Sequence, residues 1–107
     1  MAKYLWQVSY TPQGVQGLQK EGGAARRAFV QQITEKAGGK LEAFYFALGE
    51  SDLYAIVDLP DATTAMSISI TVNAAGAAAL RTIPLVTPEE MDRAMGQTVA
   101  YRVPGTR

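Results

Sequence analysis

The sequence has no cysteine and no histidine among its 107 residues. Without cysteine the chain forms no disulfide, and it has neither a thiol nucleophile nor a thiolate ligand for a metal. Without histidine it lacks the side chain that most often serves as a general base or as a metal ligand. We therefore expect no metal site and no cofactor.

An excess of either charge is also missing, because ten Lys and Arg balance ten Asp and Glu. A nucleic-acid-binding protein normally presents a basic face, so we expect no nucleic-acid partner. Zero net charge also leaves little repulsion between copies of the chain. The most apolar stretch, residues 62–80, is interrupted by Ser, Thr and Asn, and the N-terminal residues lack the apolar core of a signal peptide. We expect a soluble, cytoplasmic protein without a membrane partner.

The first recognisable element is a strand over residues 3–11. Its residues alternate, and one side carries Tyr4, Trp6, Val8 and Tyr10. This period of two is typical of a β-strand. Residues 12–14 end it, and we expect a loop or short helical turn to follow, anchored in the core by Val15 and Leu18.

The spacing then becomes helical over residues 23–37. One stripe of this helix carries Ala25, Phe29, Ile33 and Ala37, which we expect to face the core. The remaining positions include Arg26, Arg27, Gln31 and Glu35, which we expect to face water. Gly38 and Gly39 end the helix, because glycine adopts the left-handed conformation at low cost.

Residues 40–59 predict an antiparallel hairpin. Two apolar runs, LEAFYFAL and LYAIVDL, flank the polar turn 49–52. Asp61 then serves as the N-cap of a helix that reaches Gly76, although several β-branched residues weaken its helical propensity.

The remaining elements are a strand over residues 78–86 and a short helix over 88–95. Pro84 indicates that this strand lies at a sheet edge, since proline donates no ladder hydrogen bond. Thr87, Pro88 and Glu90 form a capping signal, and Gly96 ends the helix. Residues 98–103 offer one further short strand. No linker or repeat divides the chain, so we treat residues 1–107 as one domain.

The order of elements predicts an α+β, ferredoxin-like βαββαβ fold with a four-stranded antiparallel sheet, helices on one face and a short C-terminal helix. The central strands are apolar on both faces, but two helices cover only one face. Because a solvated second face should be polar, we expect a second copy of the chain to cover it.

Three segments resemble the GYD domain family: YTPQGVQGL, AGGKLEAFYFALGESDLYAIVDLPD and ALRTIPLVTPEEM. The resemblance runs from about Tyr4 to Ala94. It implies a dimeric α/β-barrel type of ferredoxin-like domain and no established reaction. Family members usually carry a tyrosine where this chain has Ser51, so a ligand site involving that position would differ here.

Seven residues are candidates for a site. Catalysis would use Asp52 or Tyr54 as acid or base and Arg81 as an anion holder. The alternatives are turn chemistry at Asp52 and a charge that blocks sheet association at Arg81. A ligand pocket would use Trp6, Tyr10, Tyr45 and Asn73, although aromatic residues more often pack in a core or dimer interface.

Three functions fit these observations. The first is a homo-oligomeric domain that binds a small apolar or aromatic ligand between sheet and helices. The second is a cofactor-independent enzyme, resembling a monooxygenase or isomerase, that acts on a small hydrophobic substrate. The third is a structural assembly subunit. The residues favour a non-enzymatic protein with itself and a small molecule as partners.

Overall fold

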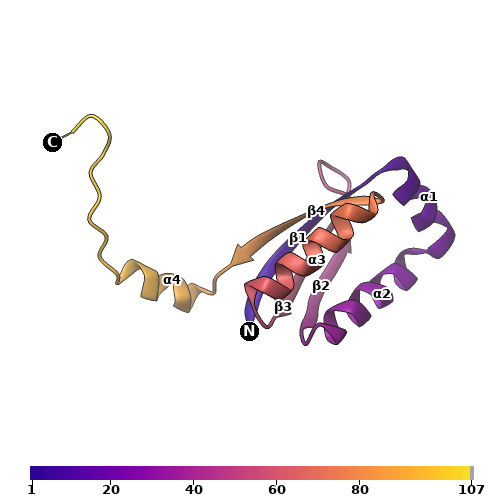
Figure 1. Ribbon diagram of the computed structural model, residues 1–107, viewed down its shortest axis with the longest axis horizontal. Coiled ribbons are helices and arrows are strands. Elements are labelled where there is room, and N and C mark those ends of the chain that lie inside the picture. The colour runs from indigo at the N-terminus through magenta and orange to yellow at the C-terminus, as the bar shows by residue number, and fades with distance from the viewer. Residues whose placement is uncertain (107) are drawn as a thin grey trace.

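The computed structural model describes residues 1–106 and shows an antiparallel sheet with helices over one face (Figure 1). The elements are β1 (Ala2–Tyr10), α1 (Pro12–Glu21), α2 (Gly23–Lys36), β2 (Lys40–Phe46), β3 (Leu53–Leu59), α3 (Ala62–Ala75), β4 (Ala78–Leu85) and α4 (Pro88–Met95). The predicted α+β class and the four-stranded antiparallel sheet are confirmed.

The strands lie in the order β2-β3-β1-β4, which is the order expected of a ferredoxin-like arrangement. All three neighbouring pairs are antiparallel. β4 is an edge strand, as its Pro84 predicted. The two strands nearest the middle, β1 and β3, pair over most of their length.

The core lies between the sheet and the helices. Alternate residues of β1 and β3 point toward the helices, and the buried set is Tyr4, Trp6, Leu53, Ala55, Val57, Leu59, Ala65 and Leu80. Val57 and Leu59 are 0% exposed. Val30 of α2 and Ile68 and Val72 of α3 pack against this set. The period-two pattern of β1 therefore placed the covered side of that strand correctly.

Residues 12–21 form a regular helix, α1, and not only the loop or short turn that we expected. The Thr11 side chain accepts a hydrogen bond from the Gly14 N–H at 3.2 Å, and proline occupies the first turn. Leu18 is half-buried, but Val15 is 43% exposed, so the prediction that Val15 anchors the core is wrong. The start of α1 lies against the chain before β4, where the Thr11 N–H donates to the Ala77 carbonyl at 3.1 Å.

α2 has the predicted bounds but a different inward side. Thr34 is 0% exposed and Val30 packs on the core, whereas Phe29 is 43% exposed. Arg26, which we expected to face water, is half-buried. The predicted stripe is therefore displaced by about one residue, because α2 lies beside the β2 edge and leaves part of its length over an opening in the helix layer.

The β2–β3 hairpin is confirmed, with a longer connection than the four-residue turn that we expected. β2 ends at Phe46 and β3 begins at Leu53. The pairing also shifts register between Leu41 and Ala43, which is a bulge. Because of this bulge, Leu41 and Phe44, which are three residues apart, both pack toward the core.

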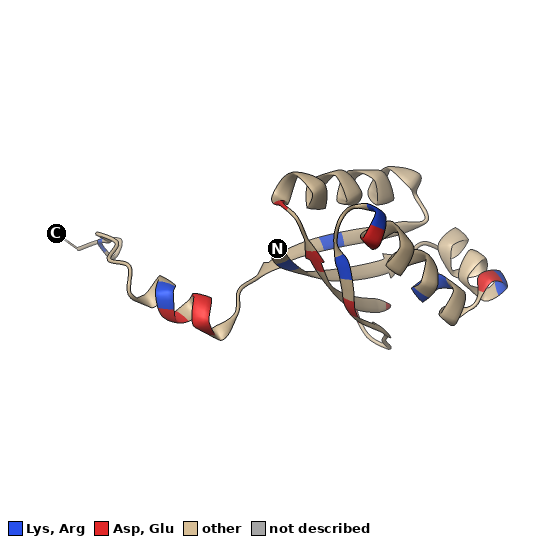
Figure 2. Cartoon of the chain, turned by 90° about the horizontal axis from the view of Figure 1, so that it is seen from below, with Lys and Arg blue, Asp and Glu red and all other residues tan. Residues whose placement is uncertain are grey.

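α3 is capped at both ends as predicted. The Asp61 carboxylate accepts a hydrogen bond from the Thr64 N–H at 2.8 Å, and Gly76 takes a left-handed conformation with φ +80°. The helix carries no charged residue, as Figure 2 shows, and its Ala65 is buried on the sheet. Both caps outweigh the β-branched residues that disfavour the helix.

The C-terminal arm, residues 86–106, extends away from the rest of the fold (Figure 1). The radius of gyration is 17.1 Å, against about 13 Å for a compact chain of roughly 100 residues. α4 has the predicted capping box between Thr87 and Glu90. Residues 98–103 form no strand. They belong to the arm that leads away from the sheet, so no strand of the described sheet lies beside them (Figure 1).

Candidate functional site

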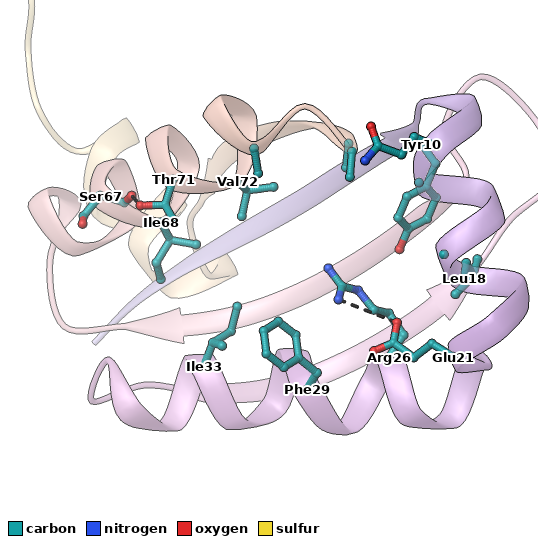
Figure 3. A pocket seen from close by; sticks show the side chains of 16 residues that line it. Tyr10, Leu18, Glu21, Arg26, Phe29, Ile33, Ser67, Ile68, Thr71 and Val72 are labelled. Carbon is teal, nitrogen blue, oxygen red and sulfur yellow. Dashed lines mark hydrogen bonds and ion pairs between the residues drawn. The ribbon is translucent and has the colours of Figure 1, made fainter.

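A groove of about 720 Å³ opens between α1 and α2 on one side and α3 on the other (Figure 3). Its lining combines apolar side chains with a few polar ones: Tyr10, Gln13, Gly14, Gly17, Leu18, Glu21, Arg26, Phe29, Ile33, Ser67, Ile68, Thr71, Val72, Ala75, Ala77 and Ala78. A mostly apolar cavity with a few convergent polar groups is the usual form of a small-molecule site.

The groove continues inward to a smaller cavity of about 50 Å³ on the core. Both spaces share Tyr10, Arg26 and Val72, and the inner one is also lined by Trp6. Trp6 is 3% exposed, and its indole Nε1 has no hydrogen-bond partner within residues 1–106. A buried donor without a partner costs about 1–3 kcal/mol in free energy of folding.

Arg26, Tyr10 and Glu21 are the charged or phenolic side chains of the groove, and Figure 3 shows the Arg26 guanidinium reaching from α2 into the space. Its Cζ lies 4.9 Å from the centroid of the Phe29 ring, which is a cation–π contact. Its Nη1 lies 3.7 Å from the Glu21 carboxylate. This distance makes a loose ion pair.

Burial raises the pKa of the Tyr10 hydroxyl, while the nearby Arg26 guanidinium acts in the opposite direction. Because the net shift is upward, Tyr10 remains a protonated phenol at neutral pH. The groove therefore contains a hydrogen-bond donor beside a cation. These two groups suit the binding of an acceptor better than the removal of a proton.

Asp52 holds the strand that carries Tyr10. The Asp52 carboxylate accepts a hydrogen bond from the Tyr10 N–H at 2.8 Å, and the Asp52 N–H donates to the Val8 carbonyl at 2.8 Å. Asp52 is half-buried and does not line the groove. Its contacts are those of a residue that extends the pairing of β1 past the first residue of β3.

The side of the sheet away from the helices, here called the open face, holds three of the other candidates. Gln7 of β1 pairs with Tyr54 on one side and Arg81 on the other, and Tyr45 pairs with Tyr54. Directly paired residues point to the same side, so these four side chains form one row across the sheet. Tyr45 is 73% exposed.

The open face also contains an ion cluster near the start of β1. The Lys3 ammonium bonds the Glu42 carboxylate and lies 3.1 Å from the Asp58 carboxylate. The hydrogen bond to Glu42 and then that to Asp58 raise the pKa of Lys3. Four apolar residues of this face lie between the cluster and the row of Arg81: Leu5, Ala43, Ile56 and Ile83.

The structure thus divides the predicted site residues. Trp6 and Tyr10 lie together at the groove, whereas Tyr45, Tyr54 and Arg81 lie on the open face. Asn73 ties α3 to β4, accepting from the Leu80 N–H at 2.7 Å and donating to the Leu80 carbonyl at 3.1 Å. Asp52, Tyr54 and Arg81 do not converge on one cavity, so their assignment to catalysis stays a prediction.

The sequence did not point to Arg26, Glu21 or Phe29 as site residues. An available signal was the pair Thr11-Pro12, which has the same cap pattern as Thr87-Pro88 and predicts a helix after β1. A helix there brings Glu21 beside the start of α2. The inward position of Arg26 had no such local signal.

Two exclusions apply to the described chain, residues 1–106. They contain no group of three His, Cys, Asp or Glu side chains able to hold a metal ion together. None of their helices has the length and apolar character needed to cross a lipid bilayer.

The fold and the groove define a small α+β protein with an antiparallel sheet and a partly open helix layer. The chain belongs to the GYD domain family, whose sequence model matches residues 4–95. The resemblance noted in the sequence is thereby confirmed. Comparison with curated proteins and with solved structures finds no match in either set. Ser51, at the position of the usual family tyrosine, is buried and does not line the groove.

Proposed function

We propose that this protein binds a small, largely apolar molecule in the groove between its sheet and its helices. The observation that carries the proposal is the opening of about 720 Å³ between α2 and α3, which lies within the range of ligand sites. Leu18, Ile33 and Ile68 supply apolar walls. A single chain that needed only a packed core would gain stability by closing this space.

The inner cavity supports the same proposal. At about 50 Å³ it has room for one or two water molecules, or for the end of a ligand that extends inward from the groove. Such a group would lie against Trp6, which lines this cavity and whose indole N–H has no partner within residues 1–106. A ligand with an acceptor at that end would satisfy a donor that the described chain leaves without a partner.

The test is the fluorescence of N-phenyl-1-naphthylamine, an uncharged apolar probe, titrated with the purified protein. We expect saturable binding by the native chain and loss of binding in Ala75→Trp, whose new ring fills the groove. Ala74→Trp is the matched control, because Ala74 is the neighbouring exposed residue of α3 and does not line the groove. Absence of binding by the native chain, or equal binding by both variants, would contradict the proposal.

We further propose that the protein is a homodimer of the α/β-barrel type, formed by packing the two open faces together. The support is the apolar row on this face, including Leu5, Ile56 and Ile83, which no helix of residues 1–106 covers. The C-terminal arm adds to it, since Met95, Val99 and Tyr101 are each more than 60% exposed. A second copy would bury surface that a monomer leaves in water.

Light scattering at micromolar concentration tests the dimer. We expect the native chain to have twice its monomer mass, and Ile56→Asp to have the monomer mass, because a carboxylate buried between two faces is strongly unfavourable. Ile70→Asp is the matched control on the outer surface of α3, where Ile70 is 61% exposed, and it should remain dimeric. A monomeric native chain would refute this proposal and leave the groove proposal standing.

The enzyme hypothesis receives less support from the structure. Tyr54 and Arg81 lie on the open face, away from the groove, and Asp52 already bonds the backbone of β1. Tyr10, which does lie in the groove, has a raised pKa and is not poised as a base. Binding is therefore the function that the geometry favours.

A further inference from the structure

We propose that the groove ligand carries one anionic group, a carboxylate or a sulfonate, and that Arg26 and Tyr10 bind it. This inference rests on the proposed function and adds the chemical class of the ligand. An apolar body with one acidic group would match the groove, whose walls are mostly apolar and whose charged and phenolic side chains, Arg26, Glu21 and Tyr10, lie toward the start of α2.

The first step is the position of Arg26. It is the one Lys or Arg side chain among the residues that line the groove, and it is half-buried. Its guanidinium is held over the Phe29 ring at 4.9 Å, which limits its orientations. A planar guanidinium presents five donors and binds a carboxylate with two parallel hydrogen bonds. Arg26 is therefore placed and shaped to receive an anion.

The second step is that the groove's own carboxylate does not saturate Arg26. The closest approach of Glu21 to Arg26 is 3.7 Å, which is longer than a hydrogen bond. Both side chains are about one third exposed, so solvent screens their attraction. Glu21 is thus a weak internal competitor, which a ligand anion with shorter contacts can displace.

The third step is the Tyr10 hydroxyl, which lies on the same side of the groove as Arg26 (Figure 3). Burial raises the pKa of Tyr10, so the hydroxyl keeps its proton and can donate to an anion. The backbone of Tyr10 is fixed by its hydrogen bond to Asp52. A donor on a fixed strand and a cation on a helix together define one anion position.

The test compares two probes that differ in one group. 8-Anilinonaphthalene-1-sulfonate is N-phenyl-1-naphthylamine with an added sulfonate. Removing a charge-assisted hydrogen bond costs about 1.5–3 kcal/mol, and each 1.4 kcal/mol is tenfold in affinity. We expect Arg26→Gln to weaken sulfonate binding about tenfold or more and to change binding of the neutral probe less than about twofold.

Glu21→Gln should act in the opposite direction. It removes the internal competitor, so we expect severalfold tighter binding of the sulfonate and no change for the neutral probe. Arg27→Gln is the matched control, because Arg27 is exposed on the same helix and does not line the groove. It removes the same charge from the protein and should leave both affinities unchanged. Circular dichroism confirms that each variant is folded.

The outcomes separate the two proposals. If the native chain binds neither probe, the groove proposal fails and this inference fails with it. If both probes bind and Arg26→Gln weakens them equally, or weakens neither, the groove proposal stands and the anion assignment is overturned. Loss of sulfonate binding in Arg27→Gln as well would show general attraction by surface charge and would also overturn the assignment.

Discussion

The two faces of the sheet come from the same strands but have different surroundings. The covered face buries Trp6, Leu53 and Leu59 under α2 and α3, while the open face leaves Leu5 and Ile56 half-buried. Alternate residues of one strand therefore differ greatly in exposure. The difference indicates that the covered face supplies most of the buried core, and it is consistent with the proposed association through the open face.

The covered face is itself incomplete. α2 packs on β2 and α3 packs on β4, but between them lies the groove with Arg26 and Tyr10 at one end. The comparison between the two faces can be tested by removing individual side chains from each.

The largest effect is expected for Leu59→Ala on the covered face. Leu59 is 0% exposed, and truncating such a side chain costs about 2–5 kcal/mol in free energy of unfolding. Ile56→Ala, on the open face of the same strand, should cost less than half of this in dilute solution. Urea unfolding at several protein concentrations measures both.

The concentration series also tests the open face. A dimer interface adds stability that depends on protein concentration, so the cost of Ile56→Ala should rise as the protein is concentrated. The cost of Leu59→Ala should stay constant. A constant and large cost for Ile56→Ala would mean that its side chain is part of the monomer core, which contradicts the assignment of the open face.

Gly14→Ala should have the next largest effect. A Cβ at Gly14 would lie 2.0 Å from the Ala77 carbonyl oxygen, so α1 must shift, and such overpacking costs about 1–3 kcal/mol. Gly17→Ala is the matched control, because a Cβ there meets nothing within 4 Å. The control should be neutral or stabilising by up to about 1 kcal/mol. Thermal unfolding of the two variants compares them, and equal midpoints would contradict the contact with Ala77.

Asn73→Ala removes the amide that holds α3 against β4. Both Leu80 backbone groups lose their partner, and we expect a cost of about 1–2 kcal/mol. Ser69→Ala should cost less than about 0.5 kcal/mol, since Ser69 only accepts a longer bond of 3.3 Å from the same amide. Hydrogen exchange at the Leu80 amide gives a direct measurement, and unchanged protection in Asn73→Ala would refute the role.

The smallest effect concerns pH and the cap of α3. The hydrogen bond from the Thr64 N–H lowers the pKa of Asp61 below 3.8. A lowered folded pKa means that the stabilisation is complete above 3.8 and is lost as the pH falls through the lower, folded value. Asp61→Asn keeps a capping oxygen without a titrating proton, so its stability should fall less on acidification. Unfolding curves from neutral to acidic pH compare the two, and parallel losses would refute the contribution.

Local chemistry made much of the fold predictable. Proline in β4, the caps at Asp61 and Thr87, and the glycine at position 76 act within a few residues of chain, and each prediction from them is confirmed. The apolar alternation of β1 likewise identified its covered side. These signals suffice for the order of the strands and the class of the sheet, but not for α1, which was expected only as a loop or short turn.

The site was less predictable because it depends on a gap between elements. Trp6 and Tyr10 belong to a stripe that the sequence shows, so they were found. Arg26 was expected in water, since a charged residue on an amphipathic helix usually lies there. It turns inward because α2 and α3 do not meet over the sheet. The distance between two helices cannot be predicted from the local sequence pattern of either one.

Pro84 has one consequence for how this molecule can assemble. An edge strand accommodates proline where the missing N–H would point away from the sheet, so an additional strand beyond β4 would find no donor there. The sheet can therefore be extended readily at only one border, along β2. Growth by repeated lateral addition uses both borders, so Pro84 disfavours such growth of the sheet.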